Sequence, residues 1–196
     1  MAGGVAIVTA FVLFGAGGHA KLLAEVLRGQ GGTIAAYCDP LPASWIGDVN
    51  HLADDDAATP DLGGAVLGLG AVTPDRLKAR LDFASSLQGR GFRLVTVRHD
   101  DATVSASATV DDGVQILAKA VIQPAAKIGA AVILNTASIV EHDALVEDGA
   151  HIAPGAIILG GARVGRCAMV GSGAIVLPGA VVAAESLVPA GSVHRA

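Results

Sequence analysis

The stretch ILNTASIVEHDALVEDGAHIAPGA, residues 133–156, has an aliphatic residue at every sixth position, and each is preceded two positions earlier by a small residue or valine. This pattern continues without interruption in both directions. Fifteen aliphatic residues follow it: Val104, Val110, Ile116, Ile122, Ile128, Leu134, Val140, Val146, Ile152, Ile158, Val164, Val170, Val176, Val182 and Val188. Glycine recurs three positions after this site, at residues 113, 149, 155, 161, 173, 179 and 191.

A strict period of six is typical of a hexapeptide β-helix, in which each hexad forms one flat face and its aliphatic residue points inward. Three faces make a coil of 18 residues, so the fifteen hexads predict five coils. The glycines fall where the chain must turn a tight corner, and glycine tolerates the positive φ needed there. An ordinary β-sandwich would not keep a six-residue register over this length.

The chain before residue 100 has a different pattern. A strand at 11–14, a glycine turn, a helix from Lys21 and a strand from Ile34 form one βαβ unit. The helix has Leu22, Leu23, Val26 and Leu27 on one face. A short strand at 65–71, a helix from about 75 to 91 and a strand at 92–97 follow, which predicts a small α/β domain.

The glycine turn GAGGHA, residues 15–20, matches the G-x-G-x-x-G/A fingerprint of dinucleotide-binding proteins through Gly15, Gly17 and Ala20. Its glycines would bring backbone N–H groups and a helix N-terminus toward a phosphate. A sheet of this size can hold a mononucleotide, but two full mononucleotide-binding halves are hard to fit. A dinucleotide is the alternative.

Composition excludes several partners. The net charge of −5 and the pI near 5.6 give no basic footprint for nucleic acid or an anionic membrane. Cys38 and Cys167 lie far apart and belong to no ligand cluster, so we expect neither a disulfide nor a metal. The uncharged run at 2–18 could be a signal-peptide core, but no Lys or Arg precedes it. We therefore expect a cytoplasmic protein; residues 1–8 have no assigned role.

The GAGGHAK loop after a first strand, the small α/β domain and the hexapeptide repeats with ILNTASIVEHDALVEDGAHIAPGA together resemble one family, from about residue 11 onward. It is the sugar O-acyltransferase or sialic acid O-acetyltransferase group of hexapeptide acyltransferases. Its acetyl-CoA-dependent N-acetyltransferases of nucleotide-linked 4-amino-sugars are the most similar.

The resemblance implies an α/β plus β fold, with a Rossmann-like nucleotide-sugar-binding domain over residues 1–100 and a left-handed parallel β-helix over 101–196. It also implies a homotrimer with active sites between neighbouring β-helices, and CoA lying along the helix. The amino-sugar, linked to UDP or GDP, would be N-acetylated in surface glycan biosynthesis. O-acetylation of sialic acid or another sugar is the alternative within the family.

Site residues are carried over by motif. His142 in VEHD resembles the general base, and Asp143 stands where close relatives have Glu. Asn135 matches the Asn of ILNT and would contact substrate, and His151 resembles the histidine that contacts the acetyl-CoA thioester. The remaining residues would line the CoA path (Gly160, Ser172 and Ala190) or face the nucleotide (Gly17, Gly18, His19 and Asp39).

The chemistry of these residues agrees with this assignment. Acetyl transfer to an amine needs a group that takes the proton of the attacking nitrogen, and a histidine with a pKa near 6.5 can do so at neutral pH. Asp143, or Glu141 next to it, can orient the ring and stabilise the imidazolium.

Residues 18 apart should stack on successive coils about 4.8 Å apart, which places Gly160 over His142 and Ala190 over Ser172. A glycine above the base leaves room for a thioester arm. His142 and His151 are nine residues apart, half a coil, so they cannot stack within one chain. If both serve one site, they come from adjacent subunits or reach round a corner.

Three other functions stay open at this point. A zinc enzyme of the hexapeptide carbonic anhydrase kind needs three histidines, and the repeats offer His142, His151 and the terminal His194. A nicotinamide-binding oxidoreductase would use Asp39 for a ribose hydroxyl. A non-catalytic scaffold would use neither. His51, His99, Tyr37 and Trp45 lie in no motif and receive no role.

Overall fold

The computed structural model describes residues 9–195, and residues 1–8 and 196 lie outside that range. The chain forms two compact units. The N-terminal unit comprises residues up to Gly70 together with Leu87–Leu94, and the β-helix unit comprises Ala71–Ser86 together with the chain from Val95 onward. No helix among residues 9–195 is long and apolar enough to cross a membrane.

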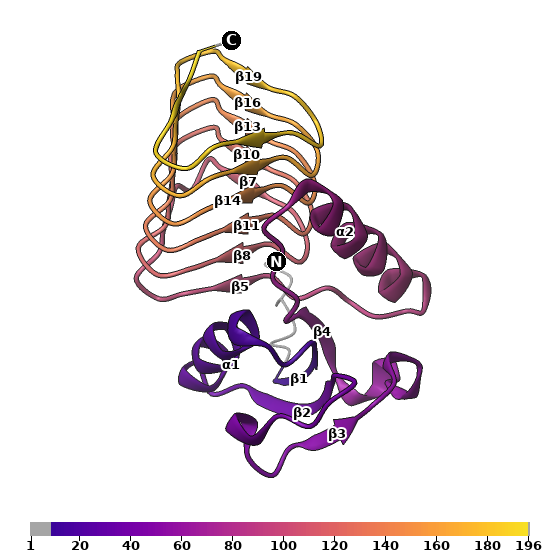
Figure 1. Cartoon of the computed structure of the whole chain (residues 1–196). Helices are drawn as coiled ribbons and strands as arrows, with labels where there is room; N and C mark the ends of the chain where they lie inside the picture. Colours follow the sequence, from indigo (N-terminus) through magenta and orange to yellow (C-terminus); the bar gives the residue numbers. More distant parts are fainter. Residues whose placement is uncertain (1–8, 196) are drawn as a thin grey trace. The chain divides into compact units, whose positions relative to one another are not determined.

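The N-terminal unit is built on a four-stranded parallel sheet in the order β3-β2-β1-β4 (Figure 1). The strand β1, in the interior of the sheet, has its last three residues fully buried. This confirms the strand expected at 11–14, and burial of consecutive residues is typical of a parallel strand that is covered on both faces. The unit's elements are β1 (Ala10–Phe14), α1 (Gly18–Gly29), β2 (Thr33–Cys38), η1 (Ser44–Ile46), β3 (Asn50–Leu52), η2 (Asp55–Ala57), η3 (Pro60–Leu62) and β4 (Gly64–Leu67).

The helix α1 buries a different stripe from the one expected. Ala20, Leu23, Ala24 and Leu27 are buried, whereas Leu22 is 46% exposed. The buried residues follow the i, i+3, i+4, i+7 spacing of one helix face, which two alanines complete. The alanines allow close packing: a side chain on Gly68, after β4, would meet the Ala20 Cβ at 3.0 Å.

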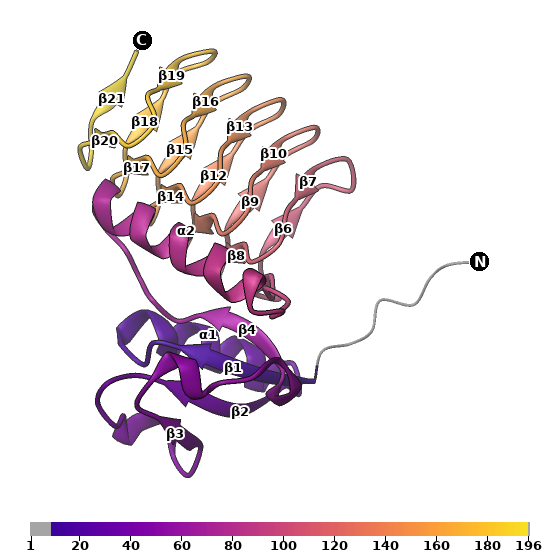
Figure 2. The same ribbon diagram turned by 90° about the vertical axis from the view of Figure 1, so that its right-hand side faces the viewer.

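In the β-helix unit, two-residue strands stack into three parallel sheets, one on each face of the coil (Figure 2). Partners in neighbouring strands are 18 residues apart, as in Ile133↔His151 and His151↔Met169. This confirms the predicted coil length, and the stack fits a left-handed parallel β-helix.

Two of the three faces are named by their outward side chains, and the covered face is named for the helix that packs against it. The covered face comprises β5 (Val97–Arg98), β8 (Gln115–Ile116), β11 (Ile133–Leu134), β14 (His151–Ile152), β17 (Met169–Val170) and β20 (Leu187–Val188). The aliphatic face comprises β6 (Thr103–Val104), β9 (Val121–Ile122), β12 (Ile139–Val140), β15 (Ile157–Ile158), β18 (Ile175–Val176) and β21 (Val193–His194). The mixed face comprises β7 (Thr109–Val110), β10 (Lys127–Ile128), β13 (Leu145–Val146), β16 (Arg163–Val164) and β19 (Val181–Val182).

The aliphatic residues of the repeat fill the interior of the coils. From Ile116 to Val188 all of them are buried, and Val104 and Val110 are partly buried against this core. The stack extends beyond the repeat at both ends, where Arg98 and His194 occupy the column of inward residues. The strand expected at 92–97 is wrong: Leu94 forms an isolated bridge to Ala65, and Val97–Arg98 is the first strand of the β-helix.

The corners have the backbone that the glycine pattern predicts. All seven repeat glycines have φ between 66° and 72°. In the part of the β-helix that the structure describes, seven corners without glycine adopt the same left-handed conformation, and Asp143, at φ 60°, is one of them. Asp and Asn are among the residues that best tolerate this region.

The helix α2 (Pro74–Gly89), whose residues up to Ser86 belong to the β-helix unit, packs against the covered face (Figures 1 and 2). Arg80 donates a hydrogen bond from Nη1 to the Ala131 carbonyl. Leu81 lies 3.0 Å from the position that a Cβ on Gly149 would take. The outward residues of this face from Val97 to Met169, His151 among them, are buried, whereas Leu187 in the last coil is exposed.

Gly149 and Gly155 form a matched pair for testing how α2 is seated. Both have φ +67°, but a Cβ on Gly155 meets nothing within 4 Å, whereas one on Gly149 meets Leu81 and Cys167 at 3.0 Å. Gly155→Ala should cost about 1 kcal/mol of unfolding free energy through backbone strain alone. Gly149→Ala should cost about 1–3 kcal/mol more because the helix must shift. Urea unfolding followed by circular dichroism measures both, and equal losses would contradict the packing described here.

Candidate active site

His142 and Asp143 occupy a corner of the β-helix between the aliphatic and the mixed face, after β12. His142 Nδ1 lies 2.8 Å from Asp143 Oδ2, and both side chains are about two-thirds exposed, at 64% and 66%. Because a carboxylate only accepts hydrogen bonds, Nδ1 carries the proton in the neutral ring. Nε2 is then left with a lone pair that can accept a proton.

The surroundings raise the pKa of His142 above its ordinary value. The hydrogen bond to Asp143 is the main cause, and the negative charges of Asp143 and Glu141 act in the same direction, against a smaller opposing effect of desolvation. The hydrogen bond and the two negative charges all favour the imidazolium. The pair therefore has the properties of a base whose protonated form is stabilised.

Gly160 stacks directly on the His142 ring. A Cβ at this glycine would lie 2.7 Å from Nε2 and 2.8 Å from Cε1 of His142, so any side chain would displace the ring. The Gly161 N–H donates to the His142 carbonyl at 3.0 Å and fixes the two coils together. The predicted stacking of Gly160 over His142 is confirmed.

A second group of predicted residues lies at the corner between the covered and the aliphatic face. Asn135 Oδ1 accepts a hydrogen bond from the Thr136 N–H at 2.8 Å, which directs Nδ2 toward His151 Nε2 at 3.1 Å. His151 Nδ1 donates to the Ala71 carbonyl at 2.7 Å. Both nitrogens of this 5% exposed imidazole thus have protein partners in its neutral form. The predicted contact of His151 with the thioester stays a prediction.

Ser172 and Ala190 lie at the same corner as Asn135, in the neighbouring column that begins at Thr136. The Gly191 N–H donates to the Ser172 carbonyl at 2.9 Å, as expected for Ala190 stacked over Ser172. A Cβ on Gly171 would lie 2.5 Å from the Ala190 nitrogen, so glycine is required beside this column. Small residues keep this edge of the β-helix narrow.

The predicted residues of the β-helix therefore form two clusters. His142, Asp143 and Gly160 lie on one edge of the aliphatic face. Asn135, Ser172 and Ala190, with His151 bonded to Asn135, lie on the other edge. The strands β12, β15 and β18 separate the clusters, so one chain does not bring them together.

In the N-terminal unit, Gly17 and Gly18 form the start of α1. Gly17 is the N-cap, no side chain caps it, and the first turn of the helix has no acidic residue. Nothing lies within 4 Å of a Cβ on either glycine. The open backbone N–H groups and the helix dipole make this end suited to an anion. His19 packs beside Gly70, whose Cβ would lie 3.0 Å from that of His19.

Asp39 fastens the glycine loop. Its Oδ2 accepts a hydrogen bond from the Ala16 N–H at 2.9 Å, and its Oδ1 accepts one from the Leu41 N–H at 3.0 Å. The carboxylate thus holds the loop and the segment after β2 in place. A direct contact between Asp39 and the nucleotide stays a prediction.

Three residues that the sequence left without a role hold the glycine loop and the segment after β2 in place. Trp45 donates from Nε1 to the Ala16 carbonyl at 2.8 Å. The Tyr37 hydroxyl accepts from the Ala43 N–H, and His51 stacks on Tyr37. Neither periodicity nor a motif marks these residues, because their roles come from a loop that returns to the first strand.

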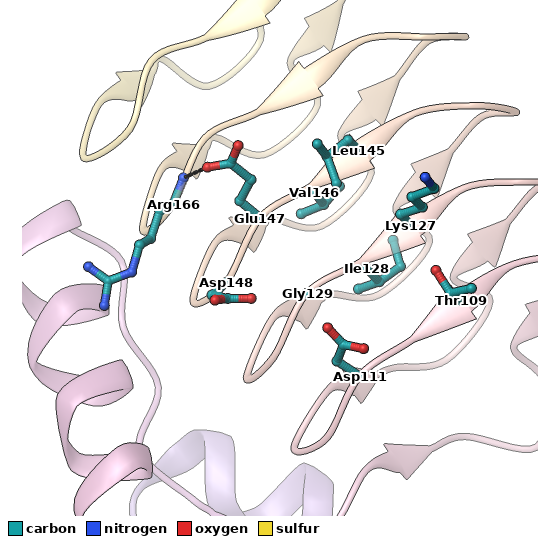
Figure 3. A pocket seen from close by; sticks show the side chains of 10 residues that line it. All are labelled: Thr109, Asp111, Lys127, Ile128, Gly129, Leu145, Val146, Glu147, Asp148 and Arg166. Carbon is teal, nitrogen blue, oxygen red and sulfur yellow. Dashed lines mark hydrogen bonds between the residues drawn. The ribbon is translucent and has the colours of Figure 1, made fainter.

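A separate hollow lies on the mixed face, beside the corner that leads to the covered face (Figure 3). Glu147 pairs with Arg163 and accepts from the Arg166 N–H, and Asp148 accepts from the Ala130 N–H at 2.9 Å. Glu147 and Asp148 therefore form hydrogen bonds with neighbouring coils. No residue of the two clusters lines this hollow. Among residues 9–195, no group of three or more His, Cys, Asp or Glu could hold a metal ion.

Comparison with protein-family models gives no match, and neither does comparison with curated proteins. Solved structures are similar over nearly the whole chain. The acetyltransferase domain of PglB from Neisseria gonorrhoeae FA1090 has a TM-score of 0.87 and 28% identity, over 95% of this chain and 91% of that one. WeeI from Acinetobacter baumannii AYE, at 22% identity and a TM-score of 0.62 over 94% and 95% of the two chains, shares the fold.

A variant of GDP-perosamine N-acetyltransferase from Caulobacter crescentus, in complex with CoA and GDP-perosamine, is 32% identical to this chain. Its TM-score is 0.84, over 95% of this chain and 88% of that one. The resemblance seen in the sequence motifs is thereby confirmed. The chain belongs to the hexapeptide-repeat acetyltransferase family that includes GDP-perosamine N-acetyltransferase.

Proposed function

We propose that the protein transfers the acetyl group of acetyl-CoA to the amino group of a nucleotide-linked sugar. The observation that carries this proposal is the His142–Asp143 pair, whose Nε2 lies beside a residue without a side chain. The family, and the CoA and GDP-perosamine bound to one of its members, support it.

In the proposed reaction, the amine nitrogen attacks the thioester carbonyl carbon while His142 Nε2 takes a proton from that nitrogen. The tetrahedral intermediate then loses CoA as the C–S bond breaks. The thiolate takes the proton back from the His142 imidazolium, which regenerates the base, and an amide and CoA thiol are the products. Asp143, at 2.8 Å from Nδ1, stabilises the imidazolium that forms in between. A general base of this kind contributes about 10² to 10⁴ in rate.

We place CoA along the β-helix, where Gly160, Ser172, Ala190 and His151 would line its path, and the sugar beside Asn135. We place the nucleotide in the N-terminal unit, which we regard as Rossmann-like because its strand order 3-2-1-4 matches the first four strands of the order 3-2-1-4-5-6. The uncapped start of α1 would bind the diphosphate. A cytoplasmic location stays a prediction.

We further propose that the protein is a homotrimer, with each active site between two copies. The outward residues of the aliphatic face are aliphatic from Val121 to Val193 and half-buried or exposed: Val121, Ile139, Ile157, Ile175 and Val193. A continuous apolar stripe of this kind is typical of a protein interface. Association of copies through this face would bring the His142 edge of one copy toward a neighbour. The two clusters would then complete one site from two chains.

The base is tested by replacing His142. Release of CoA thiol from acetyl-CoA is followed with UDP- and GDP-linked 4-amino-sugars and with free sialic acid. We expect turnover with a nucleotide-linked amino-sugar, and a fall of kcat by about 10² to 10⁴ in His142→Ala. If none of these acceptors leads to thiol release, or if the variant keeps full activity, the proposal is refuted. Calorimetry with NAD tests the dinucleotide alternative.

The pH dependence of kcat/KM tests Asp143. His142 must be neutral to act as base, so activity falls as pH drops below its pKa, which Asp143 raises. Asp143→Asn keeps a residue that tolerates φ 60° but removes the charge, so the acidic limb should shift to lower pH and the plateau should fall. Glu141→Gln, assayed with the same acceptor sugar, should shift the acidic limb less. Among the causes of the shifted His142 pKa, the charge of Glu141 contributes least. An acidic limb that stays in place in Asp143→Asn would contradict the assignment.

Ile157→Asp tests the interface. A charge at the centre of the aliphatic stripe should convert trimers of the 19.4 kDa chain to smaller species, and thiol release should fall with them. Sedimentation velocity measures the mass. Leu187→Asp is the matched control, since Leu187 is 55% exposed on the covered face. Unchanged association of Ile157→Asp would place the interface elsewhere.

A further inference from the structure

Trp45 lines two adjoining cavities of the N-terminal unit. The first, of about 380 Å³, lies beside the glycine loop and includes Gly17, Gly18 and Asp39 in its wall. The second, of about 570 Å³, lies against α1 and includes Arg28. Trp45 and Lys21 belong to both. Each volume is within the range of about 300–1,000 Å³ that small-molecule sites have.

The indole is held in a fixed position by its edge. Its Nε1–H donates to the Ala16 carbonyl at 2.8 Å, and Arg28 donates from Nη2 to the carbonyl of the next residue, Ile46, at the same distance. The ring nevertheless stays partly exposed in the cavities. An aromatic face that is rigid and open can bind a flat ligand with little loss of side-chain entropy.

Hydrogen bonds and a stacking contact hold the loop that carries Trp45 in place. His51 Nε2 donates to the Asp39 carbonyl at 2.8 Å, and its ring stacks on Tyr37 at 4.8 Å between centroids. The Tyr37 hydroxyl accepts a hydrogen bond from the Ala43 N–H at 3.0 Å. With Asp39 bound to the Ala16 N–H, the loop and the glycine turn form one preorganised wall.

Two features of this wall can bind an anion, the Lys21 ammonium and the uncapped start of α1, although Asp39 lines the first cavity and Glu25 the second. The Lys21 ammonium lies 5.9 Å from the Trp45 ring centroid, near the outer limit of about 6 Å for a cation–π contact. It can therefore reach toward a ligand at modest cost. The Asp39 carboxylate is occupied by two backbone N–H groups, which offset its charge.

We propose that Trp45 is the stacking platform for the base of a nucleoside diphosphate, with the Lys21 ammonium paired to the diphosphate. The aromatic face matches the base of that ligand, and the Lys21 ammonium and the uncapped backbone N–H groups match its diphosphate. This inference rests on the proposed function, since it names the subsite for the nucleotide of the acceptor. The adenine of CoA has the same stacking chemistry, and the experiment separates the two.

Because Trp45 is the chain's single tryptophan, its emission reports on this site alone. Titration with UDP and GDP should quench the emission to saturation, whereas inorganic pyrophosphate, which has no base, should not. By calorimetry, Trp45→Ala should raise the Kd for the nucleoside diphosphate about tenfold, in line with the worth of one base–aromatic stack. The same variant should leave the Kd for pyrophosphate unchanged.

Trp45→Phe separates stacking from fastening, since it keeps a ring but loses the hydrogen bond to Ala16. If stacking is the role, this variant keeps most of the affinity. If it loses as much as Trp45→Ala, the hydrogen bond carries the effect and the inference is wrong. Leu22→Ala, on the exposed side of α1 and outside both cavities, should bind as wild type does.

Other outcomes also decide the question. Quenching by CoA but by neither nucleoside diphosphate would overturn the inference, as would an unchanged Kd in Trp45→Ala. Thiol release with a normal KM in Trp45→Ala would refute the platform and leave the proposed reaction standing. Saturable quenching by UDP or GDP in a protein that acetylates no acceptor would support the platform and refute the reaction.

Discussion

The ladder of backbone hydrogen bonds between successive 18-residue coils determines the positions of the other residues in the coils of the β-helix. Strand N–H groups donate to the next coil, as Ile133 does to the Ala150 carbonyl, and corner N–H groups donate to the preceding one, as Gly161 does to the His142 carbonyl. The inward aliphatic column keeps the register. A residue's place in the hexad therefore determines its face, and its coil determines its neighbours. Gly160 lies on the His142 ring for this reason alone, and the exposure of Nε2 follows from it.

Much of this unit is readable from the sequence, because one residue in six has to be aliphatic and a corner has to accept positive φ. The two ends of the stack do not follow this rule. Arg98 and His194 occupy the inward column where no further coil covers them, so an aliphatic residue is not needed there. The seat of α2 was also not predictable, since it depends on Leu81 meeting the bare backbone of Gly149.

The candidate site divides in the same way. His142, Asp143 and Gly160 could be placed by counting, and the structure brings them together. The bond between Asn135 and His151 links positions 16 residues apart on different parts of the coil, and no period predicts it. In the N-terminal unit the motif located the glycine turn. Its support by Asp39 and Trp45 arises from loop geometry that no local pattern encodes.

The ladder also has a consequence for how such a protein can change in evolution. Insertion of 18 residues before His142 would move it about 4.8 Å along the axis and keep it on the same corner. Insertion of six would rotate it by one face, to the corner between the mixed and the covered face, where Asp148 now lies. Change in length is therefore quantised, and whole coils can be gained or lost while a corner keeps its chemistry.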